Sequence, residues 1–225
     1  IDMHYYERTL SEKIMSSGLH RKKVSLLFGA RQTGKTTLLR RIIPSQTCLN
    51  INLQDRQLRR RYETDEGLLV RELRSRDDIN TVFIDEIQKV PALLDDIQLL
   101  YDDDPNRYQF LLTGSSARRL RRGSANLLPG RSHQHTLSPV LQTEQRQAEI
   151  LPMAIPIGQK FPMRSLEDYL LNGNLPGFYG EDISAWKTTL ETYVDLYIEH
   201  EIRQEHVVQD MGAFVRFLRL VALEA

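Results

Sequence analysis

The sequence contains a single cysteine, Cys48, among its 225 residues. One thiol cannot form a disulfide within the chain, so a disulfide-stapled secreted domain is excluded as the fold class. A lone thiol is typical of proteins in a reducing compartment, and we therefore expect a cytoplasmic location. At this length the chain can bury a sizeable core without metals or disulfides.

The sequence also lacks a long apolar run and an excess of charge of either sign. No stretch approaches the roughly 20 apolar residues of a membrane-spanning helix, so we expect no membrane partner. Lys plus Arg and Asp plus Glu both number 30, which gives a formal net charge of zero. Binding to nucleic acid through overall charge is therefore not indicated.

Two local features remain open within this neutral composition. The arginine clusters at residues 59–61 and 118–122 can contact nucleic acid or an acidic partner, but the abundance of nearby acids favours solvated helix faces. His133 and His135 alternate along an expected strand, yet no Cys or carboxylate at ligand spacing accompanies them. We therefore predict no metal site built on these histidines.

Short apolar runs alternate with helical patterns over the first 140 residues. This alternation predicts an α/β fold, with a parallel sheet covered by helices on both faces, and in such sheets ligands bind at the carboxyl ends of the strands. The runs typical of strands are residues 23–28, 48–53, 81–87, 108–116 and 133–140. The patterns typical of helices are residues 9–18, with a capping box of Thr9 and Glu12, 34–43, 58–75 and 91–101, the last beginning at Pro91.

The character of the sequence changes near Gln142. A proline-punctuated connector follows, and then helical patterns over residues 165–173, 182–204 and 212–225, the first with a capping box of Ser165 and Asp168. We predict two parts, a core at residues 1–145 and a connector with a lid-like helical segment at 146–225. The apolar helical pattern runs to the last residue, so we expect the sequence to be part of a longer protein.

The stretch from Gly29 to Thr36 matches the phosphate-binding pattern G-x-x-x-x-G-K-[ST] at every fixed position. Glycines let successive backbone N–H groups point at phosphate oxygens, and the start of a helix adds positive character. In this pattern Lys35 reaches the β- and γ-phosphates, and the Thr36 hydroxyl ligates Mg²⁺. The alternative is a glycine-containing turn with a surface lysine, which the strand before the loop and the helix after it disfavour. The residues predicted to contact the nucleotide here are Gly29, Ala30, Arg31, Gln32, Thr33, Gly34, Lys35, Thr36 and Thr37.

The run VFIDE places two acids at the end of a buried strand. Asp85 is predicted to support Mg²⁺, and Glu86 is predicted to act as the base that activates the attacking water. The alternative is an ordinary strand end with solvated acids. An acidic pair favours hydrolysis over transfer to a second substrate, and the N-K-x-D pattern that marks guanine recognition does not follow the next strand.

Two further positions are candidates with competing interpretations. In LLTGSS, Ser115 can contact the γ-phosphate or position water, while Ser115 or Ser116 can equally cap the helix that follows. In LLPGRS, Arg131 can stabilise transition-state charge, within the chain or on a neighbouring copy. A structural arginine paired with a carboxylate is the better interpretation of Arg131 from sequence.

These motifs together resemble a known family. GARQTGKTTLL, FIDEIQKVP, LLTGSS and LLPGR followed by LSPV, in this order, resemble bacterial and archaeal AAA-type ATPases that carry a C-terminal domain of uncharacterised function. The stretches LNGNLPGFYG and LETYVDLYIEHEI resemble the segment that joins the two parts in those proteins. The resemblance implies a RecA-like or AAA core in which Lys35, Thr36, Asp85 and Glu86 hold their family roles.

The expected function is Mg²⁺-dependent binding and hydrolysis of ATP. We expect the C-terminal region to change position according to the nucleotide that is bound. The alternative is an ATP-gated switch, associated with DNA or signalling, with little intrinsic turnover. With either function, we expect the C-terminal region to bind a protein or DNA partner. Both functions are compatible with a homo-oligomer.

Overall fold

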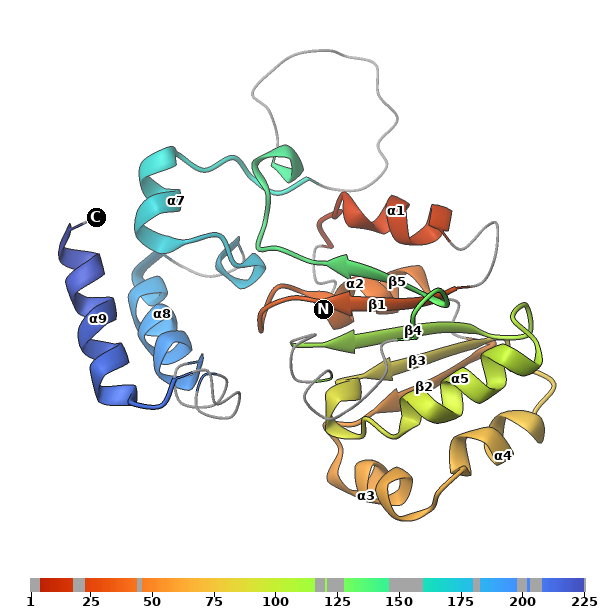
Figure 1. Ribbon diagram of the computed structural model, residues 1–225. Coiled ribbons are helices and arrows are strands. Elements are labelled where there is room, and N and C mark those ends of the chain that lie inside the picture. Colours follow the sequence, from red (N-terminus) through yellow and green to blue (C-terminus); the bar gives the residue numbers. More distant parts are fainter. Residues whose placement is uncertain are drawn as a thin grey trace, which may run out of the picture.

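A parallel five-stranded sheet forms the centre of the molecule, in the order β2-β3-β4-β1-β5 (Figure 1). The computed structural model describes residues 5–17, 23–43, 46–115, 120, 128–145, 160–179, 183–197, 202 and 208–224. The strands are β1 Val24–Phe28, β2 Cys48–Asn52, β3 Thr81–Asp85, β4 Gln109–Gly114 and β5 Ser132–Thr136. All five lie where the sequence predicts strands.

The register of the sheet brings the carboxyl ends of all strands to one edge. Strand β1 pairs in parallel with β4 on one side and β5 on the other, with Ser25 opposite Leu111 and Val24 opposite Ser132. Strand β3 pairs in parallel with β2 and β4. The segments that follow β1, β3 and β4 therefore meet at the same edge, as expected for ligand-binding parallel sheets.

Helices cover both faces of the sheet, as predicted. Successive side chains of a strand point to opposite faces, so Leu26 and Leu27 enter different cores. On one face, Ile14 of α1 (Leu10–Ser17) and Leu38 of α2 (Lys35–Ile42) pack against the Leu27 side. On the other face lie α3 (Arg56–Thr64), α4 (Leu68–Arg74) and α5 (Leu93–Asp103).

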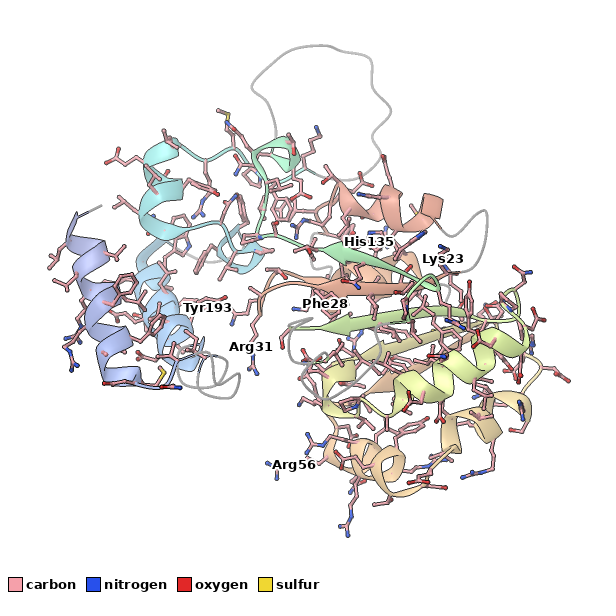
Figure 2. The ribbon with its side chains drawn as sticks, viewed as in Figure 1. Lys23, Phe28, Arg31, Arg56, His135 and Tyr193 are labelled. Carbon is pink, nitrogen blue, oxygen red and sulfur yellow. The ribbon has the colours of Figure 1, made fainter. Side chains whose placement is uncertain are left out.

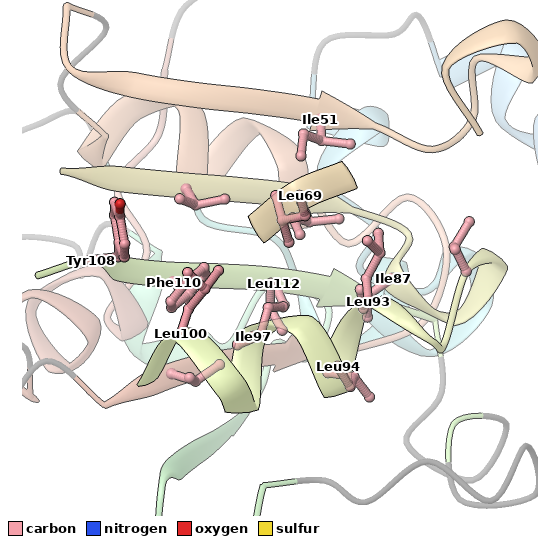
Figure 3. Packing of buried hydrophobic residues seen from close by; sticks show 14 of the residues in the cluster. Ile51, Leu69, Ile87, Leu93, Leu94, Ile97, Leu100, Tyr108, Phe110 and Leu112 are labelled. Atoms are coloured by element: carbon pink, nitrogen blue, oxygen red, sulfur yellow. The ribbon is translucent and has the colours of Figure 1, made fainter. Parts of the chain in front are cut away.

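The larger core lies under α4 and α5 (Figure 3). Ile97 and Leu100 of α5 lie over Phe110 and Leu112 of β4, and all four side chains are buried. Burial is continuous along β1 and β3, whose sequences are mainly apolar, because both faces of the sheet are covered.

Three local predictions require correction. The helix expected over residues 58–75 is two helices, separated at Gly67, whose φ of 69° is a left-handed conformation that glycine adopts without steric cost. Helix α5 begins at Leu93 and not at Pro91, which lies in the turn before it. The capping box of Thr9 and Glu12 does not form, since the Thr9 N–H donates to Glu144 over 2.9 Å.

The C-terminal helices lie beyond the carboxyl edge of the sheet (Figure 1). After the 3₁₀ turn η2 (Gln142–Glu144), they are α7 (Leu166–Asn172), the 3₁₀ turn η3 (Pro176–Tyr179), α8 (Ile183–Tyr197) and α9 (Met211–Glu224). Ser165 caps α7 as predicted, accepting the Asp168 N–H over 3.0 Å. Leu175, Phe178 and Trp186 form a small core of their own. The division of the chain at residue 145 stays a prediction.

None of the helices in the described ranges combines the length and apolar character needed to cross a bilayer.

Candidate functional site

The loop between β1 and α2 is held in shape by its two glycines. A Cβ on Gly29 would lie 2.3 Å from the backbone oxygen of Leu137, the residue that follows β5, so only glycine fits at this position. Gly34 has a φ of 89° and precedes the first residue of α2. Gln32, at the loop tip, also has a positive φ of 61°, which is uncommon for a residue with a side chain.

The Lys35 side chain folds back over this loop. Its ammonium donates to the backbone oxygens of Gly29 at 2.7 Å and Ala30 at 2.8 Å. The Thr33 hydroxyl, fully buried, donates to the same Ala30 oxygen at 2.9 Å. A cation therefore lies within the curve of the loop at the N-terminus of α2, where backbone amides and helix dipole also favour an anion.

A hydroxyl and a carboxylate join the loop to the end of β3. The Thr36 hydroxyl lies 3.1 Å from both carboxylate oxygens of Asp85. Asp85 is only 2% exposed, and the Thr113 hydroxyl at the end of β4 also donates to it. Burial of a carboxylate requires such donors, and these two residues supply them. Thr36 and Asp85 thus present adjacent oxygen ligands of the kind that Mg²⁺ prefers.

Glu86 follows directly in a left-handed conformation, with φ 63° and ψ 47°. Its N–H donates to the Thr113 hydroxyl at 3.1 Å, and its carboxylate accepts from the amide of Gln88. Gln88 belongs to the 3₁₀ turn η1 (Ile87–Lys89) and also donates to the Ser115 hydroxyl at 3.2 Å. The ends of β3 and β4 are therefore tied together behind Glu86.

These elements surround a cleft of about 320 Å³ at the carboxyl edge of the sheet. Glu86 lines it together with Gln54, which follows β2, and Lys89 of η1. The predicted loop residues that line it are Arg31, Gln32, Gly34, Lys35, Thr36 and Thr37. Arg31 is exposed and extends away from the end of β1 (Figure 2). Asp85 and Ser115 do not line the cleft themselves, but Asp85 contacts the lining residue Thr36, and Ser115 accepts a hydrogen bond from Gln88.

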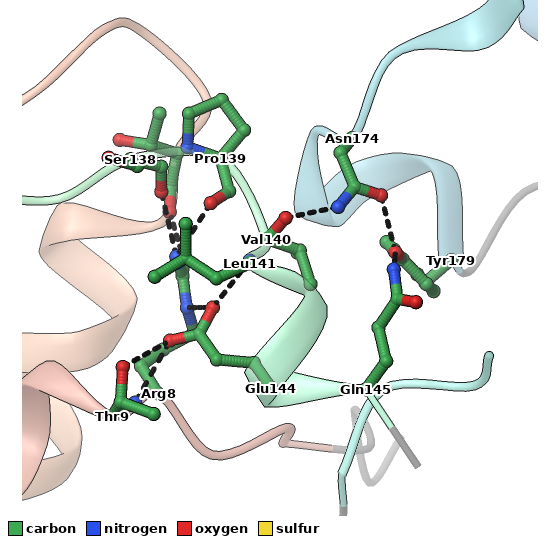
Figure 4. Close-up of polar contacts among 11 residues, drawn as sticks. Arg8, Thr9, Ser138, Pro139, Val140, Leu141, Glu144, Gln145, Asn174 and Tyr179 are labelled. Atoms are coloured by element: carbon green, nitrogen blue, oxygen red, sulfur yellow. Dashed lines mark hydrogen bonds and ion pairs between the residues drawn. The ribbon is translucent and has the colours of Figure 1, made fainter. Parts of the chain in front are cut away.

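Behind the loop, Arg8 connects three separate segments (Figure 4). Its guanidinium donates to the Thr33 backbone oxygen at 2.8 Å, to the Ser138 oxygen at 2.7 Å and to the Glu144 carboxylate at 3.0 Å. The side chains of this ion pair are 5% and 1% exposed. Glu144 is also held by the N–H groups of Thr9 and Leu141. The ion pair thereby fixes the back of the loop to the chain that leaves β5.

Arg131 lies at the opposite edge of the sheet. It immediately precedes β5, and its backbone oxygen accepts from Val24 at the start of β1. Its guanidinium forms a two-point ion pair with Asp102 of α5, at 2.6 and 2.9 Å. This contact lowers the pKa of the Asp102 carboxyl below its ordinary value. The structure does not bring Arg131 to its own cleft, and it shows the carboxylate pairing that the sequence favoured.

Four residues of this region were missed by the sequence interpretation: Arg8, Gln54, Gln88 and Lys89. Gln88 and Lys89 lie in the quoted FIDEIQKVP stretch, and their proximity to Glu86 was the available signal. Nothing local marks Arg8, whose carboxylate partner is 136 residues away. Ser116 and the arginines of residues 118–122 lie outside the described residues.

Within the part of the chain that the structure describes, no group of three or more His, Cys, Asp or Glu residues forms a metal-binding cluster.

Comparison with solved structures finds ATPases and helicases of low identity. A Walker-type ATPase of Pyrococcus abyssi is 18% identical, with a TM-score of 0.46, and the match covers 60% of this chain and 54% of that one. The PCH-2 protein of C. elegans is 16% identical, with a TM-score of 0.42, covering 61% and 44%. The Pif1 helicase of Candida albicans is 13% identical, with a TM-score of 0.43, covering 61% and 41%. The chain thus spans about half the length of these structures.

A comparison with curated proteins gives no match. Among protein families, the AAA domain matches residues 21–145, more than half of the chain. This range begins just before β1 and ends just after η2, so it contains the sheet, the loop, Asp85 and Glu86. The chain belongs to the AAA domain family.

Proposed function

We propose that this chain binds ATP together with Mg²⁺ and hydrolyses it to ADP and phosphate. The observation that carries the proposal is the convergence of Lys35, Thr36 and Glu86 on one cleft, with Asp85 directly behind Thr36. Membership of the AAA domain family supports the same reaction.

In the proposed complex the loop binds the phosphates of ATP. The amides at the start of α2 and the Lys35 ammonium provide positive charge on one side of the cleft. Lys35 exchanges its bonds to the loop oxygens for bonds to the β- and γ-phosphates, which are stronger because both partners are charged. Thr36 and Asp85 would hold Mg²⁺, and the bound ion would supply positive charge that offsets the charge developing on the phosphate oxygens.

Glu86 is the proposed base. Glu86 lines the cleft together with residues of the loop, and a carboxylate there can accept a proton from a water attacking the γ-phosphate. Its left-handed backbone is a strained conformation of a kind that is typical of functional sites.

The C-terminal region is the proposed recipient of the nucleotide signal. Arg8 contacts the loop and Glu144 at once, and Val140 pairs with Asn174 through the Val140 N–H at 2.8 Å. A Cβ on Gly34 would lie 3.9 Å from the ring of Pro176 in η3. We therefore expect a shift of the loop to reach the segment that leads into α8 through the contacts of Arg8, Glu144 and Val140.

Removal of Mg²⁺ tests the proposal. We expect EDTA to abolish phosphate release from ATP and excess Mg²⁺ to restore it, because Thr36 and Asp85 cannot replace the charge of the ion. The variant Thr36→Val should need more Mg²⁺ for half-maximal turnover, since it lacks the hydroxyl. Thr64→Val removes a hydroxyl that bonds the Arg60 oxygen on α3, and it should match the unaltered protein. Turnover that is indifferent to EDTA would count against the site.

The placement of Arg131 gives a second expectation. Arg131→Gln should leave the turnover of the isolated, dilute chain unchanged, because the guanidinium lies at the far edge of the sheet. A fall of about 10³-fold, the loss typical of a finger arginine, would show that Arg131 reaches phosphate. If the loss appears only as protein concentration rises, the recipient is a neighbouring copy. Phosphate release measured across a dilution series separates these outcomes.

A further inference from the structure

Gln88 has contacts that the reaction proposed above does not use. Its side chain is 5% exposed, and its amide nitrogen donates both to the Glu86 carboxylate and to the Ser115 hydroxyl, the latter at 3.2 Å. It thus joins the side chain of the proposed base to the end of the neighbouring strand β4.

The orientation of this amide is dictated by Glu86. An ionised carboxylate only accepts hydrogen bonds, so the NH₂ group of Gln88 must face it. The amide oxygen then points the other way, where it has no hydrogen-bond partner among the described residues. A buried unsatisfied oxygen is unfavourable, so the amide takes this orientation because its nitrogen is needed at Glu86.

The end of β4 makes room for the Gln88 amide. A Cβ on Gly114 would lie 2.9 Å from the Gln88 amide oxygen and 3.2 Å from the ring of Phe28, so a larger residue at position 114 would displace the amide. What holds the amide in place is its pair of hydrogen bonds, to Glu86 and to Ser115.

Glu86 itself is fixed at two points. Its left-handed backbone conformation is strained for a residue with a side chain, and such conformations persist where neighbouring groups hold them. The Thr113 hydroxyl holds its N–H, and Gln88 holds its carboxylate. Without the hydrogen bond from Gln88, the Glu86 carboxylate can rotate about the bonds of its side chain.

We propose that Gln88 is a positioning residue, which acts through Glu86 by holding its carboxylate at the angle required to activate water. This role rests on the proposed ATP hydrolysis, with Glu86 as the base. It gives Gln88 no contact with ATP, so its loss affects the rate of the chemical step and not nucleotide binding.

The test uses steady-state ATP hydrolysis and ATP binding by Gln88→Met, which keeps the size of the side chain and removes the donor. We expect kcat to fall about 10- to 100-fold, the effect of a misplaced catalytic group, with unchanged affinity for ATP. The same substitution in a Glu86→Gln background should cause no further loss, because the residue through which Gln88 acts is already gone. Gln88→Asn keeps a buried amide but shortens its reach, and it should show the same loss if the Met variant does not fold.

Unchanged kcat in a folded Gln88 variant would overturn the positioning role, even if Glu86→Gln is slow and the proposed function stands. An equal loss in both backgrounds would also overturn it, since it would indicate a structural role. If the unaltered chain releases no phosphate from ATP, the proposed function fails, and the role of Gln88 fails with it.

Discussion

Replacing Glu86 with glutamine is expected to slow ATP hydrolysis at least ~10²-fold while ATP binding is retained. Glutamine has the shape of glutamate but cannot accept a proton from water at neutral pH. Its side-chain oxygen can still accept the bond from Gln88, so the local packing survives. The contacts proposed for phosphate belong to the loop and α2, and the substitution does not alter them.

This expectation is checked by phosphate release at saturating ATP and Mg²⁺, with binding measured by titration of the same samples. Glu63→Gln provides the matched control, because Glu63 is an exposed residue of α3 whose ion pair with Arg59 is solvated. It should hydrolyse ATP as the unaltered protein does. Normal turnover by Glu86→Gln would remove Glu86 from the catalytic role.

Replacing Arg8 with methionine is expected to reduce the free energy of unfolding by about 3 kcal/mol. The substitution leaves the buried Glu144 carboxylate without its cationic partner, although the N–H groups of Thr9 and Leu141 still donate to it. The Thr33 backbone oxygen loses its donor as well. Since that oxygen belongs to the loop, ATP affinity should fall about tenfold, the value of one charge-assisted hydrogen bond.

Urea unfolding and ATP titration of the same variant measure both effects. Arg71→Met is the control, because Arg71 pairs with Asp65 at the surface, where both side chains are more than half exposed. Such pairs contribute at most about 1 kcal/mol. Adding Glu144→Gln to Arg8→Met should recover part of the lost stability, since it neutralises the unpaired carboxylate. Equal stability of Arg8→Met and Arg71→Met would contradict the structural role given to this ion pair.

The sheet and its binding edge were predictable because their signals are local. Parallel strands buried on both faces have mainly apolar sequences, as in β1 and β3, and the glycine-lysine pattern follows the first of them directly. Once the strands are parallel, the segments after β1, β3 and β4 must meet at one edge. The contact between Thr36 and Asp85, 49 residues apart, follows from this geometry.

The same topology argument could have placed Arg131. A residue that precedes a parallel strand lies at the amino edge of the sheet, opposite the loop that follows β1. The order of the motifs along the sequence does not show at which edge of the sheet each motif lies. That edge follows only from whether the motif precedes or follows a parallel strand. The break at Gly67 was likewise visible as a glycine within a helical pattern, but it was outweighed by the apolar periodicity around it.

Arg8 and Gln88 mark the limit of prediction from sequence. Arg8 lies in an unremarkable N-terminal stretch, and its importance arises only when the chain after β5 returns to it. Gln88 lies two residues from Glu86, which was the available signal, but its bond to Ser115 at the end of β4 forms only in the folded sheet. Hydrophobic periodicity contains no record of contacts such as Arg8 with Glu144 and Gln88 with Ser115.

Binding of ATP to Lys35→Ala, compared with the unaltered chain at equal Mg²⁺, tests the central claim most directly. Alanine removes the cation within the loop but leaves the loop glycines and the start of α2 in place. The phosphate-binding assignment predicts that the unaltered chain binds ATP and releases phosphate, and that Lys35→Ala loses both activities while remaining folded. Equal ATP affinity of the two proteins would exclude this loop as the phosphate site.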